Sequence, residues 1–291
     1  ISGTILEPRR KQIIKILKNK ENQSKNVLLI TTQVVEAGVD IDMDLGFKNR
    51  SIVDSEEQLA GRINRNVNKQ GCKVYLFDFD DASIIYQKDL RFKETNKSLD
   101  GDYFDILRTK NFDKLYDKVK AWLSKTNSES GLRGTVRFFA TNLIGQLSFP
   151  EVDKEFELIE NENTTVFVPL TVPLKSENEE VFSSQQLGFL ADFDIYPNKG
   201  GLCGKEVFEL YKRLIKDKDL KFTDRRKNLK ILQSIMSQFT FSLFSKSKLV
   251  NELINGGNQE EFGYLYLVSY EDVYDYNLGL IDNKFKELIF I

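Results

Sequence analysis

With 291 residues, 41% of them hydrophobic and 30% charged, and a net charge of −2, the chain is long enough to bury a core and to hold two domains. No apolar run approaches the ~20 residues that span a bilayer, and no basic-then-apolar segment opens the chain, so we expect no membrane partner. The two cysteines, Cys72 and Cys203, can form neither a disulfide framework nor a zinc site. This composition favours a cytoplasmic protein.

The sequence contains no histidine. Serine-triad hydrolysis, Cys–His catalysis and histidine-ligated metal sites are therefore excluded, and we predict no metal site within the chain. The first residue is Ile1 rather than methionine. We therefore expect a fragment or a processed product.

The N-terminal part predicts alternating helices and strands. A helix is expected from Pro8, because apolar residues recur at helical spacing over residues 13–17. The apolar, β-branched run 27–30 suits a fully buried strand, and a second short run covers residues 43–47. Residues 73–77, KVYLF, are typical of a further strand.

A helix between these strands carries two arginines. Ser55 with Gln58 three residues later is the pattern of a capping box, so we expect the helix to begin at Ser55. Arg62 and Arg65 are three residues apart and would share one face of that helix. Two guanidinium groups on one face repel each other, and a shared anion such as phosphate explains them best. Residues 8–80 thus indicate an α/β fold with an open, mostly parallel sheet.

Two blocks of this region resemble a known family. Residues 31–42, TTQVVEAGVDID, and residues 58–66, QLAGRINRN, resemble motifs V and VI of superfamily 2 helicases. More narrowly, they are similar to the CRISPR-associated helicase–nuclease of type I interference systems, which serves antiviral defence. The family usually has an arginine directly after the glutamine of motif VI, and this chain has Leu59 there.

The resemblance implies part of a second RecA-like motor lobe, which moves along single-stranded DNA by hydrolysing ATP. By match to motif V, Thr32 with Thr31 would contact the DNA backbone. Gly38 and Asp40 would face the nucleotide, Asp40 through its ribose.

By match to motif VI, Gln58, Arg62 and Arg65 would reach the phosphates, and the two arginines would be catalytic because fixed positive charge stabilises a transferring phosphoryl group. The implied cofactors are ATP and magnesium. The implied partners are single-stranded DNA, the RNA-guided surveillance complex, a first helicase lobe and a histidine–aspartate nuclease domain.

The other half of an ATP site is not found in this sequence. A phosphate-cradling loop needs the pattern G-x-x-x-x-G-K-[ST], and Gly204-Lys205 fails it because Lys199 replaces the first glycine and Glu206 the hydroxyl residue. No acidic box follows a strand. We therefore expect this chain alone to be inactive as an ATPase.

Two other functions stay open. Asp78 and Asp80 follow a predicted strand, as in magnesium-dependent phosphatases of the haloacid dehalogenase type, but Ala82 stands where those enzymes have threonine or valine. The C-terminal half could instead be a non-catalytic module that binds DNA or protein. Residues 205–248 support this alternative, because they hold twelve basic and five acidic residues.

The rest of the chain predicts a helical linker and an α+β domain. Domain boundaries are expected at 1–82, 83–127 and 128–291. The expected elements are helices over 83–97, 112–123, 205–217 and 223–244, a hairpin formed by 155–160 and 164–170, and a strand over 263–270. The segment 274–280, YDYNLGL, resembles the tyrosine-and-glycine segment near the family's C-terminus.

Overall fold

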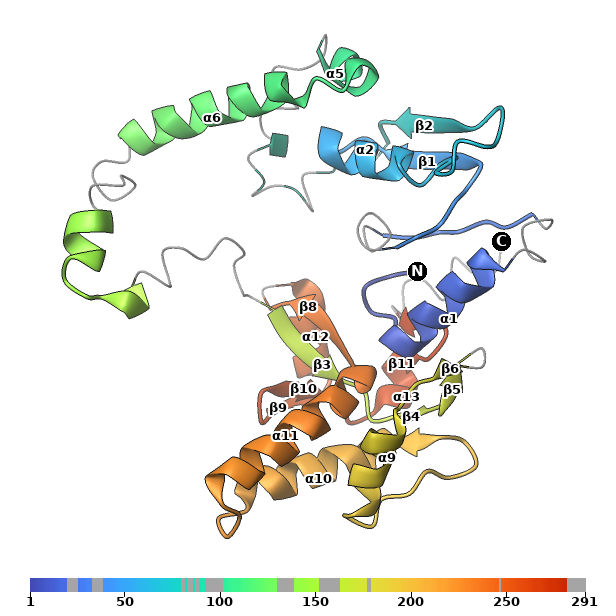
Figure 1. The fold of residues 1–291 in the computed structure, drawn as a ribbon, viewed down its shortest axis with the longest axis vertical. Coiled ribbons are helices and arrows are strands. Elements are labelled where there is room, and N and C mark those ends of the chain that lie inside the picture. The colour runs from blue at the N-terminus through green and yellow to red at the C-terminus, as the bar shows by residue number, and fades with distance from the viewer. Residues whose placement is uncertain are drawn as a thin grey trace. The chain divides into compact units, whose positions relative to one another are not determined.

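The computed structural model describes residues 1–19, 26–32, 39–79, 82, 86, 89, 91–92, 102–129, 139–151, 163–176, 179–245 and 247–281. The chain divides into two compact units, which are treated separately here (Figure 1). One unit consists of residues 36–161, and the other joins residues 1–35 to residues 162–291. No helix in the described ranges is long and apolar enough to cross a membrane.

The unit of residues 36–161 is built on two parallel strands. Strand β1 (Leu45–Asn49) pairs in register with β2 (Lys73–Phe77), and α2 (Val53–Ala60) lies between them in sequence. Helices α5 (Tyr103–Thr109) and α6 (Phe112–Glu129) follow, and Phe139–Ile144 forms a short π-helix. A small core gathers Val53, Tyr103, Ile106, Leu115 and Val119.

The other unit contains a four-stranded mixed sheet in the order β8-β3-β10-β9. Its central strand β3 (Asn163–Phe167) is antiparallel to β8 (Thr240–Phe244) and parallel to β10 (Tyr264–Tyr266), which is antiparallel to β9 (Gln259–Glu261). Helices α10 (Gly204–Lys216) and α11 (Phe222–Met236) pack side by side. The remaining elements are α1 (Glu7–Lys18), β4 (Thr171–Val172), β5 (Lys175–Ser176), β6 (Glu179–Glu180), α9 (Ser184–Ala191), β7 (Leu202–Cys203), a 3-10 turn (Ser237–Phe239), α12 (Lys248–Asn255), α13 (Tyr270–Val273), β11 (Tyr274–Asp275) and β12 (Gly279–Leu280).

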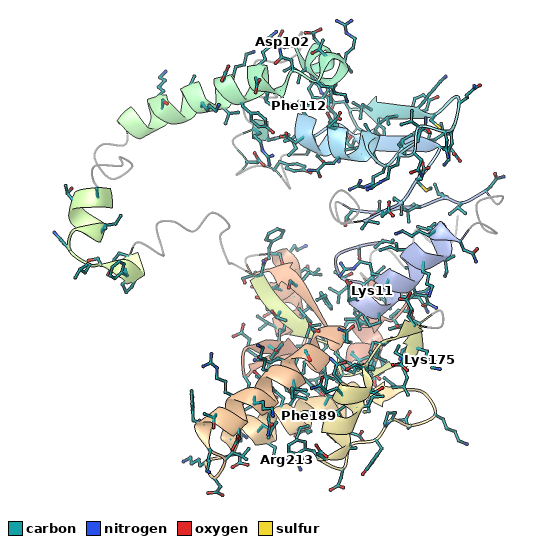
Figure 2. All side chains as sticks on the ribbon, viewed as in Figure 1. Lys11, Asp102, Phe112, Lys175, Phe189 and Arg213 are labelled. Carbon is teal, nitrogen blue, oxygen red and sulfur yellow. The ribbon has the colours of Figure 1, made fainter. Side chains whose placement is uncertain are left out.

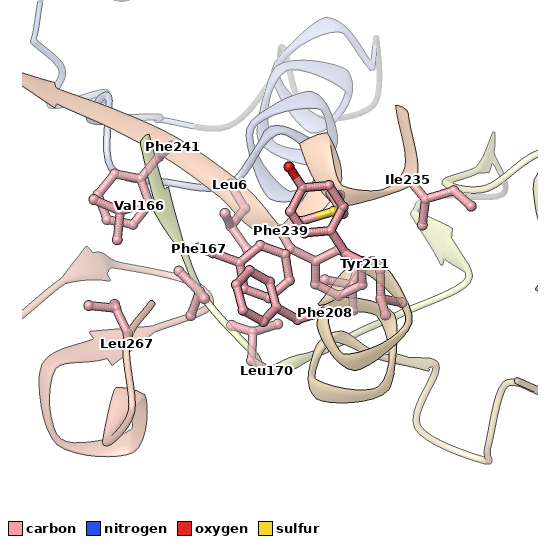
Figure 3. Packing of buried hydrophobic residues seen from close by; sticks show 14 of the residues in the cluster. Leu6, Val166, Phe167, Leu170, Phe208, Tyr211, Ile235, Phe239, Phe241 and Leu267 are labelled. Carbon is pink, nitrogen blue, oxygen red and sulfur yellow. The ribbon is translucent and has the colours of Figure 1, made fainter. Parts of the chain in front are cut away.

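Aromatic rings fill the core of this larger unit. Phe167 on β3 is fully buried, with its ring centroid 4.8 Å from that of Phe208 and 5.8 Å from that of Phe239. Figure 3 shows these rings meeting between β3 and the helices, with Leu6 of the N-terminal segment inside the same cluster. Aromatic rings bury large apolar areas and favour tilted or offset contacts of this kind.

The N-terminal segment is bonded to the last hairpin of the larger unit. The hydroxyl of Tyr274 donates to the carbonyl of Thr4 over 3.0 Å and accepts from the amide of Leu6 over 3.2 Å. Gly279 has a φ of +85°, and a Cβ there would lie 2.4 Å from Oγ1 of Thr4. The YDYNLGL segment therefore holds the residues that lead into α1.

Several predicted elements are confirmed. The helix from Pro8, the strand 73–77, the helix over 112–123 and the helix over 205–217 all appear, with ends shifted by a few residues at most in three cases and by six in α6. Both α/β mixing and parallel strand pairing are present. The identification of a RecA-like lobe stays a prediction.

The predicted buried strand at 27–30 is wrong. These residues form no strand, and the side chains of Leu28 and Ile30 are 83% and 77% exposed. An apolar run becomes a buried strand only where neighbouring strands take up its backbone groups, and no described strand pairs with this one.

The predicted helix over 223–244 and the predicted strand over 263–270 are too long. Helix α11 ends at Met236, and after a single 3-10 turn the chain continues as β8, whose pairing with β3 overrides the helical period. Only Tyr264–Tyr266 pairs as a strand, and Tyr270 begins α13. The first arm of the predicted hairpin, 155–160, and most of the predicted helix 83–97 lie outside the described residues.

The two units also differ from the predicted boundaries at 82 and 127. Residues 1–35 group with residues 162–291 because the N-terminal segment contributes Leu6 to their core. Whether 1–82, 83–127 and 128–291 are separate functional domains stays a prediction.

Candidate functional site

The helix that was expected to carry both arginines ends before them. Helix α2 begins at Val53, so Ser55 lies inside it and caps nothing, and the helix ends at Ala60 with Gly61 as its C-cap. Arg62 and Arg65 follow in a turn, so they do not share a helix face. The apolar Ile52 and Val53 are buried at the start of α2, and this packing rather than a side-chain cap determines where the helix begins.

This turn runs beside the acidic segment of the first motif. The amide of Met43 donates to the carbonyl of Arg62 over 2.9 Å, and the amide of Asn64 donates back to the carbonyl of Met43 over 2.9 Å. Gly46 permits the close approach of β1, because a Cβ there would lie 3.1 Å from Cγ1 of Ile63. The fold therefore brings the two sequence blocks together.

Asp42 fixes the backbone of the arginine turn. Its Oδ1 accepts from the amide of Arg65 over 3.0 Å, and its Oδ2 accepts from Nδ2 of Asn66 over 3.0 Å. Nζ of Lys69 lies 3.4 Å from Oδ1 of Asp42 and 2.9 Å from Oδ1 of Asp44. The side chain of Asp42 is mostly buried, whereas that of Asp44 is exposed.

These contacts shift two ionisation equilibria. Burial disfavours the charged form of Asp42, but hydrogen bonds from Arg65, Asn66 and Lys69 outweigh it, so the pKa of Asp42 is below its ordinary value. Burial likewise opposes the charge of Lys69, and hydrogen bonds to Asp44 and Asp42 overcome this and raise the pKa of Lys69. Both groups are therefore held in their charged forms.

Asn64 stabilises the turn from within. Its φ is +49°, a left-handed conformation that asparagine tolerates better than most residues. Its Nδ2 donates to the carbonyl of Lys69 over 3.0 Å, and its Oδ1 accepts from the amide of Lys69 over 2.9 Å. From the sequence alone, Asn64 and Asn66 belonged to the second motif block without a role and Lys69 had none, although asparagines are a usable signal for side-chain-stabilised turns.

Arg65 points its charge at the other motif. Its Nε lies 3.2 Å from Oδ1 of Asp40, and both side chains are exposed. An exposed ion pair of this kind contributes no more than about 1 kcal/mol, so an anion of higher charge can displace the carboxylate. The arrangement therefore offers one guanidinium on a backbone that is fixed and a head group that is free to change partners.

The other predicted site residues lie as follows. Gln58 is exposed on the last turn of α2, and Arg62 is half-buried. Thr31 is half-buried and Thr32 exposed, in the unit that contains residues 1–35. Gly38 lies outside the described residues.

The phosphatase alternative gains little from the structure. Asp78 is exposed directly after β2, and Asp80 lies outside the described residues. Among the residues that are described, no group of three histidine, cysteine or acidic side chains could hold a metal ion.

Comparison with known proteins finds two matches, and both are to nuclease/helicase sequences. Residues 4–68 match the sequence family described as CRISPR-associated nuclease/helicase Cas3, C-terminal. A protein of Methanothermobacter thermautotrophicus, named CRISPR-associated nuclease/helicase Cas3, is 35% identical over 94 residues. The aligned part covers 30% of this chain and 11% of that relative.

Both comparisons confirm the predicted resemblance, because residues 4–68 are similar to the C-terminal part of the Cas3 nuclease/helicase. The family match spans both motif blocks and ends just before Lys69. The aligned part is a small fraction of the relative, so the activity and partners of a complete protein are inferred only below.

Proposed function

We propose that this chain is the C-terminal part of an ATP-dependent translocase that moves along single-stranded DNA and works with a nuclease in CRISPR interference. The observation that supports it is the turn in which Asp42 fixes the backbone of Arg65 while the guanidinium faces Asp40. A fixed backbone with an exchangeable charge is what a phosphate-sensing arginine requires.

ATP suits the residues of this site. In the proposed enzyme Arg65, with Arg62 beside it, binds the terminal phosphates, and Asp40 turns from Arg65 to the ribose. Gln58 and Gly38 complete this side of the nucleotide, while Thr31 and Thr32 contact the DNA backbone. Magnesium would neutralise the phosphates and belongs with the first lobe, as does the phosphate-cradling loop. The proposal therefore places hydrolysis in the complete enzyme and not in this chain alone.

The role of Arg65 would couple hydrolysis to the closing of the two motor lobes. Its charge would meet the γ-phosphate only when the lobes close, so ATP would be hydrolysed rapidly only in the closed state. Arginine fingers in related phosphoryl transfer contribute roughly 10³–10⁵ in rate, or about 4–7 kcal/mol of barrier. Lysine would replace Arg65 poorly because it lacks the planar fork.

The test uses the complete enzyme with Arg65→Ala and Arg65→Lys. DNA-stimulated ATP hydrolysis should fall by about a thousandfold or more in Arg65→Ala, while the melting temperature stays close to wild type. Arg108→Ala is the matched control, because Arg108 is also an exposed arginine, with its Nη2 2.8 Å from Oδ1 of Asp105. Rates within a few-fold of wild type in both Arg65 variants would remove Arg65 from the site.

A further inference from the structure

The exposed side of α11 carries a cluster of cations. Lys221, Arg226, Lys227 and Lys230 are all exposed. None of them forms an ion pair with any residue in the described part of the chain. Asp224, three residues before Lys227, is the acidic neighbour within the helix, and it does not reach that lysine. Arg226, Lys227 and Lys230 lie within about 100° of one another around the helix axis and are defined here as the α11 basic face.

The position of these cations weakens the helix that carries them. Lys221 is the N-cap, at the positive end of the helix dipole, and Arg226 and Lys227 lie in the second turn, where the dipole no longer favours or opposes them strongly. The last turn of α11, where cations would be favourable, has no basic residue. Arg226 and Lys230 are also four residues apart, a spacing at which like charges repel.

The neighbouring helix shows the ordinary arrangement. Helix α10 has Glu206 in its first turn and Arg213 and Lys216 in its last. Its Lys212 lies 2.6 Å from Glu209 and 3.4 Å from Glu261. Both helices have an acidic residue in the first turn, Glu206 in α10 and Asp224 in α11, but only α10 has cations in its last turn and an ion-paired lysine, Lys212. The cations of α11 are therefore left available to an external anion.

An exposed aromatic ring lies at the start of α11, in line with two of its cations. Phe222 is 67% exposed, although it is a large apolar side chain. Phe222, Arg226 and Lys230 recur every four residues and so follow one another along one side of the helix, over about 12 Å. An aromatic ring in line with cations can stack on a base while the cations contact successive phosphates.

We propose that the α11 basic face binds single-stranded DNA, with Arg226, Lys227 and Lys230 on the phosphates and Phe222 against a base. The choice of DNA rests on the proposed function, but the surface uses none of the residues assigned to ATP. Stacking requires unpaired bases, so single strands should bind better than duplexes. The inference adds a second DNA contact, made by the C-terminal part of the chain.

The charge contacts are tested by titrating the full 291-residue chain into a fluorescent oligothymidylate without ATP, at several salt concentrations. The plot of log affinity against log salt has a negative slope, and each lost phosphate contact should make it shallower by about 0.7. The double variant Arg226→Gln/Lys230→Gln should therefore make it shallower by about 1.4. Lys175→Gln/Lys199→Gln removes the same charge at exposed positions on other segments, Lys175 being on β5 (Figure 2), and should leave the slope unchanged.

The stacking contact is tested by Phe222→Leu and Phe222→Trp, with thermal melts to check folding. Leucine should weaken binding by about 5- to 150-fold, and tryptophan should keep it. The inference would be overturned if the wild-type chain does not bind the oligothymidylate at low salt. It would also be overturned if the control pair Lys175→Gln/Lys199→Gln changes the salt dependence as much as Arg226→Gln/Lys230→Gln does, or if the wild-type chain binds a duplex as tightly as a single strand. Because the assay contains no ATP, its failure leaves the Arg65 proposal standing, and inactivity of the Arg65 variants likewise leaves this one standing.

Discussion

Asp42 illustrates how a single carboxylate can organise a turn, here the turn whose guanidinium is proposed to bind phosphate. It accepts from the amide of Arg65 and from the side chain of Asn66, while Lys69 lies between it and Asp44. The sequence allowed Arg65 to be chosen by resemblance, but these supporting contacts join residues more than twenty positions apart. No local pattern predicts them, because they depend on β1 bringing the acidic segment against the turn.

The lowered pKa of Asp42 makes a prediction about pH. An ordinary aspartate has a pKa of about 3.9, and the folded state favours the ionised form of Asp42 beyond that. Its contribution to the free energy of unfolding is therefore fully present above about pH 4 and is lost as the pH falls through the folded-state pKa. We expect Asp42→Asn to destabilise by roughly 1 kcal/mol at neutral pH, since solvent screens part of the interaction, and by progressively less as the pH falls from about 4 through the folded-state pKa.

Urea unfolding of wild type and Asp42→Asn across this pH range measures the effect. Asp44→Asn is the control, because Asp44 contacts the same Lys69 but is exposed and does not hold the backbone of Arg65. It should change stability by less than Asp42→Asn. An equal stability difference between wild type and Asp42→Asn at both ends of the range would contradict the assignment.

At the scale of elements, periodicity predicted best where packing agrees with it. Helices α6 and α10 were foreseen because their apolar spacing matches the residues that they bury. Helix α1 was foreseen from the same spacing although only Pro8 is buried, and strand β2 from its β-favouring residues although none is buried. The run 27–30 and the C-terminal end of the predicted helix 223–244 were mistaken, because strand pairing decided them. Whether a run pairs depends on partners far along the chain, and periodicity contains no information about them.

Helix caps show the same dependence on context. Ser55 with Gln58 and Ser183 with Gln186 have the same spacing, yet only the second pair forms a capping box. Oγ of Ser183 accepts from the amide of Gln186 over 3.2 Å, and Oε1 of Gln186 accepts from the amide of Ser183 over 2.8 Å. At Ser55 the burial of Val53 starts the helix two residues earlier, and the serine becomes an interior position.

We expect Ser183→Ala to lower the free energy of unfolding by about 1 kcal/mol, because it leaves the amide of Gln186, in the first turn of α9, without its side-chain partner. Ser184→Ala is the control, since Ser184 is equally exposed but is the first helical residue and caps nothing. Chemical denaturation of the two variants compares them directly. Equal stabilities would mean that water replaces the cap without cost.

At the scale of the whole molecule, the family match does not coincide with one compact unit. Residues 4–68 begin in the unit that contains the C-terminal half and continue in the unit of residues 36–161. Leu6 lies in the aromatic core, and the hydroxyl of Tyr274 joins Leu6 to Thr4. Burial raises the pKa of Tyr274, so this hydroxyl keeps its proton and can go on donating. Contacts that join the two ends of a chain cannot be read from local sequence.

The glycine of the last hairpin tests this attachment. Gly279 and Gly263 both have a φ of +85°, so alanine at either position costs about 1–2 kcal/mol from backbone strain. At Gly263 a Cβ meets nothing within 4 Å, whereas at Gly279 it meets Oγ1 of Thr4 at 2.4 Å and the amide nitrogen of Ile5 at 3.2 Å. Gly279→Ala should therefore destabilise by about 1–3 kcal/mol more than Gly263→Ala.

The two alanine variants should also differ in hydrogen exchange at the N-terminal segment. Overlap with Thr4 pushes that segment away from the hairpin and breaks the bonds that Leu6 and Leu280 donate to Tyr274 and Thr4. The amide of Leu6 should thus exchange faster in Gly279→Ala and stay protected in Gly263→Ala, because exchange reports local opening. Equal losses of stability in the two variants, together with equal protection of the Leu6 amide, would contradict the prediction. The C-terminal hairpin would then not hold the first residues of the family match.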